Sequence, residues 1–198
     1  VQYLFNRTTQ LKRGDTILFH AAAGGVGLIA CQWARALGVT MIGTVGSDAK
    51  ADLARAHGCT HVINYNTEDF VKRVAEITNG EKVPVVYDSI GKDTFIGSLD
   101  CLRPRGLMVS FGSASGPVEP FGLNELASRG SLFVTRPSLF AYAATRQDLE
   151  EMSADLFGMV ESGKVKIEIN QRYSLADAAK AHVELEARKT TGSSILLP

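Results

Sequence analysis

The chain has 198 residues, of which 45% are hydrophobic and 21% charged, and its 21 Lys and Arg residues balance its 21 Asp and Glu residues. This length suffices for one domain with a real core, and zero net charge argues against a nucleic-acid surface or an acidic tail. Three widely spaced cysteines, at positions 31, 59 and 101, exclude a disulfide framework and favour reduced thiols in the cytoplasm, and neither an 18-residue apolar run nor a signal peptide is recognisable.

Short apolar strands alternate with helical stretches between Thr16 and Thr135. The predicted strands are residues 16–19, 40–45, 61–64, 83–87, 106–111 and 131–135, and the predicted helices are residues 28–37, 48–57, 69–78, 94–102 and 123–128. Such alternation is typical of a parallel sheet that is covered by helices on both faces. The sequence therefore predicts an α/β doubly wound fold, a six-stranded Rossmann sheet in the order 3-2-1-4-5-6.

The C-terminal part of the chain departs from this alternation. Helices predicted over residues 146–162 and 176–188 are followed by a short apolar strand, residues 192–197, without a predicted partner. We expect residues 189–198 to pair with a part of the protein outside this chain. The first residue is Val1, and residues 1–5 resemble the end of a helix, so residues 1–198 are expected to be one domain of a longer protein.

A glycine-rich turn from His20 to Gly27 follows the first predicted strand and precedes the first predicted helix. Its residues Ala22-Ala23-Gly24-Gly25-Val26-Gly27 match the dinucleotide fingerprint G-x-G-x-x-G, with alanine at the first glycine position. Backbone N–H groups and the helix dipole at such a turn attract a pyrophosphate. The alternative is a plain turn, but the position between strand and helix favours a dinucleotide site.

The end of the second predicted strand indicates which dinucleotide is bound. NAD-binding folds usually carry Asp or Glu there for the ribose 2′-OH, whereas this chain has Gly46 and Ser47. Lys50 follows in the first turn of a helix, where it opposes the dipole, so a bound 2′-phosphate explains it better than a surface role does. Ser47 fits either a phosphate ligand or an N-cap, and Asp48 either a ribose ligand or a helix-start charge. NADPH is the favoured cofactor.

The ends of the other predicted strands should line the same crevice, because ligands bind beyond the carboxyl ends of such strands. Ordinary turns are the alternative at each of them. His20 is expected to be a hydrogen-bonded framework residue rather than a catalyst, and Asp88 to support the fold rather than act as a base. The four histidines have no metal-ligand spacing. The strand ends concerned are Asn64-Tyr65, Asp88-Ser89, Phe111-Gly112-Ser113 and Arg136-Pro137-Ser138.

Together these motifs resemble the NADPH-dependent quinone oxidoreductases, which are zeta-crystallin-like, zinc-free members of the medium-chain dehydrogenase/reductase superfamily. The family has alanine in the first glycine position, so Ala22 is no departure from its pattern. The resemblance covers essentially the whole chain in order. It rests on residues 20–34, 62–65, 85–89, 105–112 and 134–139.

The resemblance implies a role for each motif in holding NADPH. Gly25 and Val26, beside Gly24, would hold the pyrophosphate, and Gly46, Ser47, Lys50 and Tyr65 would surround the 2′-phosphate, with Arg188 reaching back to it. Ser89 would lie near the adenine, Phe111, Gly112 and Ser113 near the nicotinamide, and Pro137, Ser138 and Leu139 near the carboxamide, with Tyr3 as a further contact.

The implied activity is hydride transfer from NADPH to a quinone. Family members carry an N-terminal GroES-like domain that forms the other wall of the active site, so catalytic residues are not assigned within this chain. The resemblance also implies a homodimer formed through residues 131–135 and no metal. The balanced charge predicts no nucleic-acid partner, and the lack of a long apolar run predicts no membrane partner. Two alternatives stay open: reduction of an enone or other activated alkene, and a non-enzymatic NADPH-binding sensor or structural module.

Overall fold

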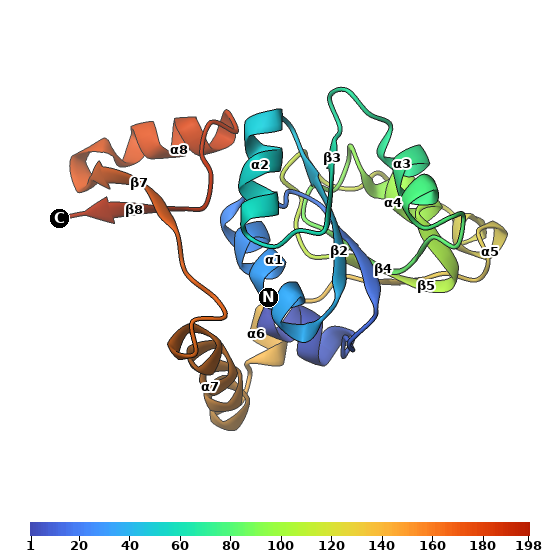
Figure 1. Cartoon of the computed structure of the whole chain (residues 1–198), viewed down its shortest axis with the longest axis horizontal. Helices are drawn as coiled ribbons and strands as arrows, with labels where there is room; N and C mark the ends of the chain where they lie inside the picture. The colour runs from blue at the N-terminus through green and yellow to red at the C-terminus, as the bar shows by residue number, and fades with distance from the viewer.

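A parallel sheet of six strands forms the centre of the protein in the computed structural model, which describes residues 1–198 (Figure 1). The strands are β1 (Thr16–Phe19), β2 (Thr40–Val45), β3 (His61–Asn64), β4 (Val83–Asp88), β5 (Leu102–Ser110) and β6 (Phe133–Thr135). Their order is β3-β2-β1-β4-β5-β6 and every pair is parallel, which confirms the predicted doubly wound sheet. The order reverses between β1 and β4, and a ligand crevice is expected beyond the carboxyl ends of these strands.

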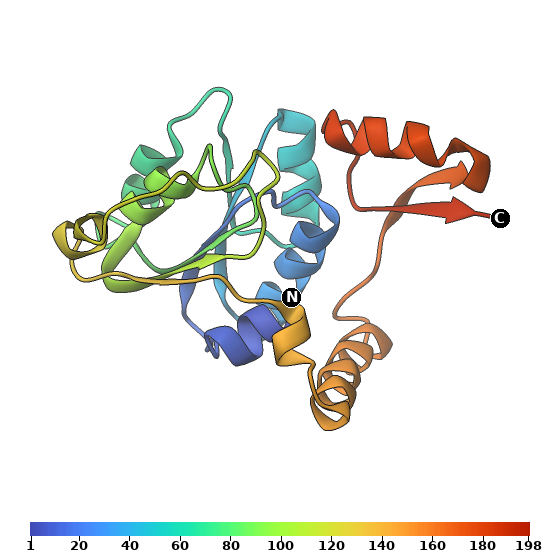
Figure 2. The same ribbon diagram turned by 180° about the vertical axis from the view of Figure 1, so that it is seen from behind.

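Helices cover both faces of this sheet (Figures 1 and 2). They are α1 (Gly25–Leu37), α2 (Asp48–Ala56), α3 (Phe70–Ile77), α4 (Phe95–Asp100), α5 (Asn124–Ser128), α6 (Leu139–Tyr142), α7 (Arg146–Glu161) and α8 (Ala178–Glu186), with a π-helical turn at Leu4–Thr8 and a 3-10 turn at Leu175–Asp177. One core cluster holds Trp33 of α1 and Ala54 of α2, and a second holds Val74 of α3 and Leu99 of α4. Burial on both faces explains the continuously apolar strands. None of the helices is both long and apolar enough to span a membrane.

The start of α1 differs from the prediction in a way that matters for the site. The helix begins at Gly25, before the expected start at Leu28, and its N-cap residue Gly24 has no side chain to cap the first N–H groups. By contrast, the Asp69 carboxylate caps α3 by accepting hydrogen bonds from two backbone N–H groups. The first turn of α1 therefore keeps N–H groups available for a ligand.

Two boundaries predicted near Pro104 are wrong. The helix expected over residues 94–102 ends earlier, as α4, and β5 begins at Leu102 instead of Gly106. The cause is a pairing between Leu102 and Val83, after which the register of the ladder shifts. The strand therefore continues past a proline that normally marks the end of a ladder.

Strand β6 is one of the two edge strands of the sheet, and β3 is the other. Strand β6 begins at Phe133 rather than at the predicted Ser131, because Ser131 takes a left-handed backbone conformation with φ of 60°. The Phe133 side chain is 60% exposed. An open edge with an apolar side chain on it is available for pairing with another strand.

The C-terminal residues form a small unit that stands beside α2, away from the six-stranded sheet (Figures 1 and 2). Its strands β7 (Ile169–Ser174) and β8 (Ser193–Leu197) pair in parallel and are joined through α8. The prediction that the last strand has no partner within the chain is therefore wrong. The sequence does not predict β7 because Ile169-Asn170-Gln171-Arg172-Tyr173-Ser174 lacks an apolar pattern. Several apolar side chains of this unit are exposed, namely Leu175, Val183, Leu185, Leu196 and Leu197.

Candidate functional site

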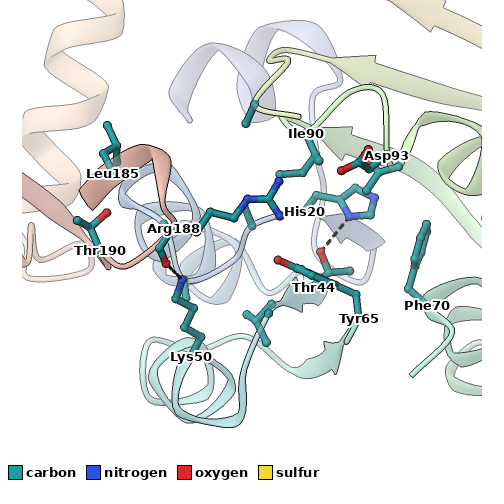
Figure 3. A pocket seen from close by; sticks show the side chains of 17 residues that line it. His20, Thr44, Lys50, Tyr65, Phe70, Ile90, Asp93, Leu185, Arg188 and Thr190 are labelled. Atoms are coloured by element: carbon teal, nitrogen blue, oxygen red, sulfur yellow. Dashed lines mark hydrogen bonds between the residues drawn. The ribbon is translucent and has the colours of Figure 1, made fainter. Parts of the chain in front are cut away.

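A cavity of about 410 Å3 opens beyond the carboxyl ends of β1, β2 and β4 (Figure 3). The glycine turn forms one side of it through Ala21, Ala23 and Gly24, and the first residues after β4 form another through Ile90. Leu185 of α8 also lines it, so the C-terminal unit supplies a wall. The cavity thus lies where the strand order predicts a ligand crevice.

The backbone of the glycine turn explains its residue types. Ala21 has a φ of 57°, and its carbonyl oxygen accepts a hydrogen bond of 3.0 Å from the Gly24 N–H. A Cβ atom at Gly27 would lie 2.3 Å from that same carbonyl oxygen, so only glycine fits where α1 crosses the turn. This close packing brings the uncapped start of α1 next to the cavity.

The segment at Gly192, just before β8, lies across the glycine turn. The Gly192 N–H donates to the Ala23 carbonyl oxygen at 3.3 Å, and Gly192 forms an isolated bridge with Gly24. A Cβ atom at Gly25 would lie 3.0 Å from the Gly192 oxygen. Gly25 therefore faces this crossing segment, and Val26, whose side chain is 47% exposed, also lies outside the cavity lining.

Two cationic side chains and a tyrosine meet at the end of β2. Lys50 Nζ donates to the Arg188 carbonyl oxygen at 2.6 Å, which joins the first turn of α2 to the segment after α8. The Arg188 side chain extends into the cavity, and neither cation has an ion pair with a carboxylate (Figure 3). Tyr65 packs against Gly46, where a Cβ atom would lie 2.5 Å from the tyrosine oxygen. This corner carries positive charge without a carboxylate to neutralise it.

Ser47 and Asp48, for which the sequence leaves two roles open, each make one side-chain hydrogen bond in the structure. Ser47 Oγ accepts a hydrogen bond of 3.3 Å from the Lys50 N–H, so Ser47 is the N-cap of α2. Asp48 Oδ1 accepts one of 2.9 Å from the Asn64 side-chain amide and is not part of the cavity lining. Asp48 is thus held by β3 instead of facing a ribose.

Ser89, Phe111, Gly112 and Ser113 gather beyond β4 and β5, next to the cavity but not in its lining. A Cβ atom at Gly112 would lie 2.6 Å from the Ser89 carbonyl oxygen, so the two loops are in close contact. The ring of Phe111 packs on that of Phe19, with centroids 5.6 Å apart. These four residues therefore lie beyond the ends of β4 and β5, where Ser89 and Gly112 are in close contact.

Residues Pro137, Ser138 and Leu139 follow β6, and Tyr3, near the N-terminus, lies against α6. None of these four residues lines the cavity. Tyr3 stacks on Tyr142 of α6 with ring centroids 5.2 Å apart, and its pKa is raised, first by burial and then by Tyr142. The cavity and this group therefore occupy separate stretches of the strand ends. The sequence likewise predicts Pro137, Ser138 and Leu139 at the opposite end of the cofactor from Lys50 and Tyr65, and this assignment stays a prediction.

Several cavity residues were not predicted as site residues. The strand-end rule points to Thr44 and Val45 only as neighbours of Gly46, and nothing local predicts that Phe70 or Leu185 reaches the cavity. His20, predicted as a framework residue, also lines it, and is hydrogen-bonded through both ring nitrogens. The further lining residues that the prediction did not name are Ile90, Asp93, Thr94, Ala114 and Thr190.

Comparison with known proteins agrees with the fold. The family model described as zinc-binding dehydrogenase matches residues 25–157, which is more than half of the chain. The chain belongs to the zinc-binding dehydrogenase family. The resemblance to quinone oxidoreductases that the sequence indicates is confirmed by close relatives in this family.

Three similar proteins illustrate this relationship. The quinone oxidoreductase of Pseudomonas aeruginosa is 60% identical over 197 residues, which are 100% of this chain and 61% of the relative. The 2-haloacrylate reductase of a Burkholderia species is 50% identical over 198 residues, 100% of this chain and 60% of the relative. The crystal structure of Escherichia coli quinone oxidoreductase complexed with NADPH superimposes with a TM-score of 0.97 at 55% identity, covering 99% of this chain and 61% of that one. The chain thus spans about three fifths of the length of these relatives.

The name of the family implies zinc, and the residues of this chain do not fit a zinc site. No group of three or more His, Cys, Asp or Glu side chains is arranged to hold a metal ion. Cys31 and Cys59 belong to one core cluster and Cys101 to the other, and all three are buried thiols.

Proposed function

We propose that this chain is the NADP(H)-binding domain of an oxidoreductase that transfers a hydride from NADPH to a quinone. The observation that carries the proposal is the meeting of Lys50, Tyr65 and Arg188 at the end of β2, where an NAD-binding fold would present a carboxylate. Two unpaired cations in a cavity beside a helix start favour a ligand with several phosphate groups.

The residues present fit NADPH along the whole row of strand ends. The uncapped start of α1, at Gly24, Gly25 and Val26, would accept the pyrophosphate. Lys50, Tyr65 and Arg188 would hold the 2′-phosphate, and Ser47, whose oxygen accepts from the Lys50 N–H, can still donate its hydroxyl proton to it. Gly46 leaves room beside Tyr65. Towards the nicotinamide end would lie Ser89, Phe111, Gly112, Ser113, Pro137, Ser138, Leu139 and Tyr3.

In this function the chain binds and orients, and it does not itself exchange bonds. When bound, NADPH would supply the hydride, and the quinone ring stabilises the oxyanions that form on reduction. The cations at the 2′-phosphate anchor one end of the dinucleotide, and the strand ends beyond β5 and β6 fix the other. Such positioning is a large part of what an enzyme contributes to a hydride transfer.

A second candidate is the reduction of an activated carbon–carbon double bond. It is favoured by the 50% identity to the 2-haloacrylate reductase, which is close to the 55% identity to a quinone oxidoreductase of Escherichia coli. The same cofactor geometry serves both reactions, because an alkene conjugated to a carbonyl or carboxylate also accepts a hydride.

An assay of the intact protein with several hydride acceptors separates these functions. NADPH oxidation is followed with a set of quinones, a set of enones and 2-haloacrylates. Oxidation that depends on quinones supports the proposal, and oxidation with alkenes alone supports the second candidate. Binding of NADPH without turnover of any acceptor would assign the chain to a non-enzymatic sensor or structural module.

We also infer that the rest of the protein docks on the unit formed by β7, β8 and α8. Two-stranded sheets are rarely stable alone, and this unit leaves Leu175, Val183 and Leu196 exposed. The relatives are longer by an amount that fits a further domain. That domain would form the second wall of the active site and contribute residues to the substrate site.

A homodimer through the open edge at β6 is part of the same proposal. The unpaired strand and the exposed Phe133 favour pairing with a second copy across a two-fold axis. Light scattering should give a dimer for the wild type and a shift toward monomer for Phe133→Pro. A monomeric wild type at micromolar concentration contradicts the dimer. We propose the cytoplasm as its compartment, because all three cysteines are free thiols.

A further inference from the structure

A chain of buried polar side chains runs beneath the cavity from β2 to β4. His20, at the end of β1, contacts Thr44 Oγ1 through Nδ1 and Ser98 Oγ through Nε2, each at 2.9 Å. Ser98 of α4 in turn donates to Asp88 Oδ2 at 3.1 Å. All four residues are buried, His20 at 1% and Asp88 at 0% exposure.

The hydrogen bonds of Asp88 determine which group donates and which accepts in each hydrogen bond between these four side chains. Its Oδ1 accepts from the N–H groups of Ile90 and Gly91, at 2.7 and 3.0 Å, and its Oδ2 accepts from the hydroxyls of Thr94 and Ser98. Since Asp88 accepts from four donors, the single proton of Ser98 is committed to it.

The proton positions on the imidazole follow from this commitment. Ser98 Oγ can only accept from His20, so Nε2 carries the ring proton and Nδ1 accepts from the Thr44 hydroxyl. The ring is neutral, because burial lowers the pKa of His20 more than the charge of Asp88 raises it. Thr44 therefore donates to His20, His20 donates to Ser98, and Ser98 donates to Asp88.

The two ends of the chain support opposite walls of the cavity. Thr44 lies on the β2 side, next to Gly46, and its carbonyl oxygen accepts a hydrogen bond of 3.0 Å from Ala22 of the glycine turn. Asp88 lies on the β4 side and holds the turn that presents Ile90 to the cavity. Figure 3 shows His20 and Thr44 hydrogen-bonded at the back of the cavity, between these walls.

We propose that His20 is a positioning residue of the nucleotide site: through the Thr44–His20–Ser98–Asp88 chain it sets the separation of the β2 wall from the β4 wall. This role rests on the proposed function, because the ligand is taken to be NADPH. His20 acts through Thr44 and Asp88, so it tunes how tightly the adenosine half is held. The nicotinamide end lies outside the cavity lining and should not respond.

The tautomer is tested by nitrogen NMR on the intact protein labelled with 15N-histidine. The His20 signals are those absent from the His20→Gln variant. The expected result at neutral pH, without any nucleotide, is a neutral ring protonated at Nε2. A ring protonated at Nδ1, or an imidazolium, would overturn the directed chain.

The positioning role is tested by kinetics and binding with two variants. His20→Phe keeps an aromatic ring against Phe70 but removes both nitrogens, and Ser98→Ala keeps His20 but cuts the chain before Asp88. Each should raise the KM for NADPH and the Kd for adenosine 2′,5′-bisphosphate about tenfold, the equivalent of one hydrogen bond to a charged group. At saturating NADPH, kcat should stay within about twofold of wild type. His182→Gln, on the exposed side of α8, is the matched control and should change neither constant.

The outcomes separate this role from the proposed function. If the wild type binds no NADPH, the proposed function and this role fall together. If the wild type binds NADPH and the Ser98→Ala and His20→Phe proteins bind it equally well, only the positioning role is refuted. A fall in kcat with an unchanged KM would also refute it, because a general loss of folded enzyme produces that pattern.

Discussion

Lys50 offers the sharpest test of how the cavity selects its ligand. It sits in the first turn of α2, where its charge opposes the helix dipole, and its Nζ donates to the Arg188 carbonyl oxygen at 2.6 Å. Lys50→Ala should therefore leave the helix at least as stable as before. The variant loses the bond to Arg188 for either cofactor, but it loses a phosphate contact only for NADPH.

The expected change in cofactor preference follows from the energy of that contact. A hydrogen bond to a charged group contributes about 1.5–3 kcal/mol, so the ratio of NADPH to NADH affinity should fall roughly tenfold to 150-fold. Fluorescence titration of both cofactors on the intact protein measures the ratio. Lys72→Ala is the matched control, because Lys72 occupies the same position in the first turn of α3, away from the cavity. An unchanged ratio in Lys50→Ala, or an equal fall in Lys72→Ala, would refute the assignment of the 2′-phosphate site.

Three further outcomes are expected. Gly27→Ala should destabilise the protein by about 3 kcal/mol or more, because its Cβ would lie 2.3 Å from the Ala21 oxygen, whereas Gly158→Ala, in open space on α7, should not lower the melting temperature. Burial lowers the pKa of His20 below its usual 6.5, so on acidification the unfolded state binds a proton before the folded state does. The stability that is present above pH 6.5 should therefore be lost as the pH falls. Denaturant titrations at several pH values should give a free energy of unfolding that depends less steeply on pH in His20→Gln, by up to about 1.4 kcal/mol per pH unit. Burial raises the pKa of Cys101 to about 12, so peptide mass spectrometry should find it unalkylated by iodoacetamide at pH 8 until the protein is unfolded; rapid labelling of the native protein would contradict this burial.

Local patterns predicted the sheet because its strands are buried on both faces. Ile17, Leu18 and Phe19 are all fully buried, which gives an apolar run that no other element type explains as well. The residues at the end of β2 could also be predicted as a site, because Gly46 and Lys50 are close in sequence as well as in space. In such cases the local signal and the tertiary structure agree.

Contacts between distant segments could not be predicted in this way. Lys50 and Arg188 are 138 positions apart, and only the resemblance to a family pointed to Arg188. The buried chain from His20 to Asp88 depends on α4 packing against β1, with His20 and Ser98 separated by 78 positions. Strand β7 lacks an apolar pattern because both its faces are largely exposed within this chain, so periodicity carries no signal there.

In the proposed function, the cavity prefers NADPH to NADH. Calorimetric titration of the intact wild-type protein with each cofactor in turn, at the same pH and salt concentration, measures this preference. NADPH should bind more tightly by about 1–3 kcal/mol, roughly five- to 150-fold in Kd, because of its contacts with Lys50, Tyr65 and Arg188. Equal Kd values for the two cofactors would contradict it.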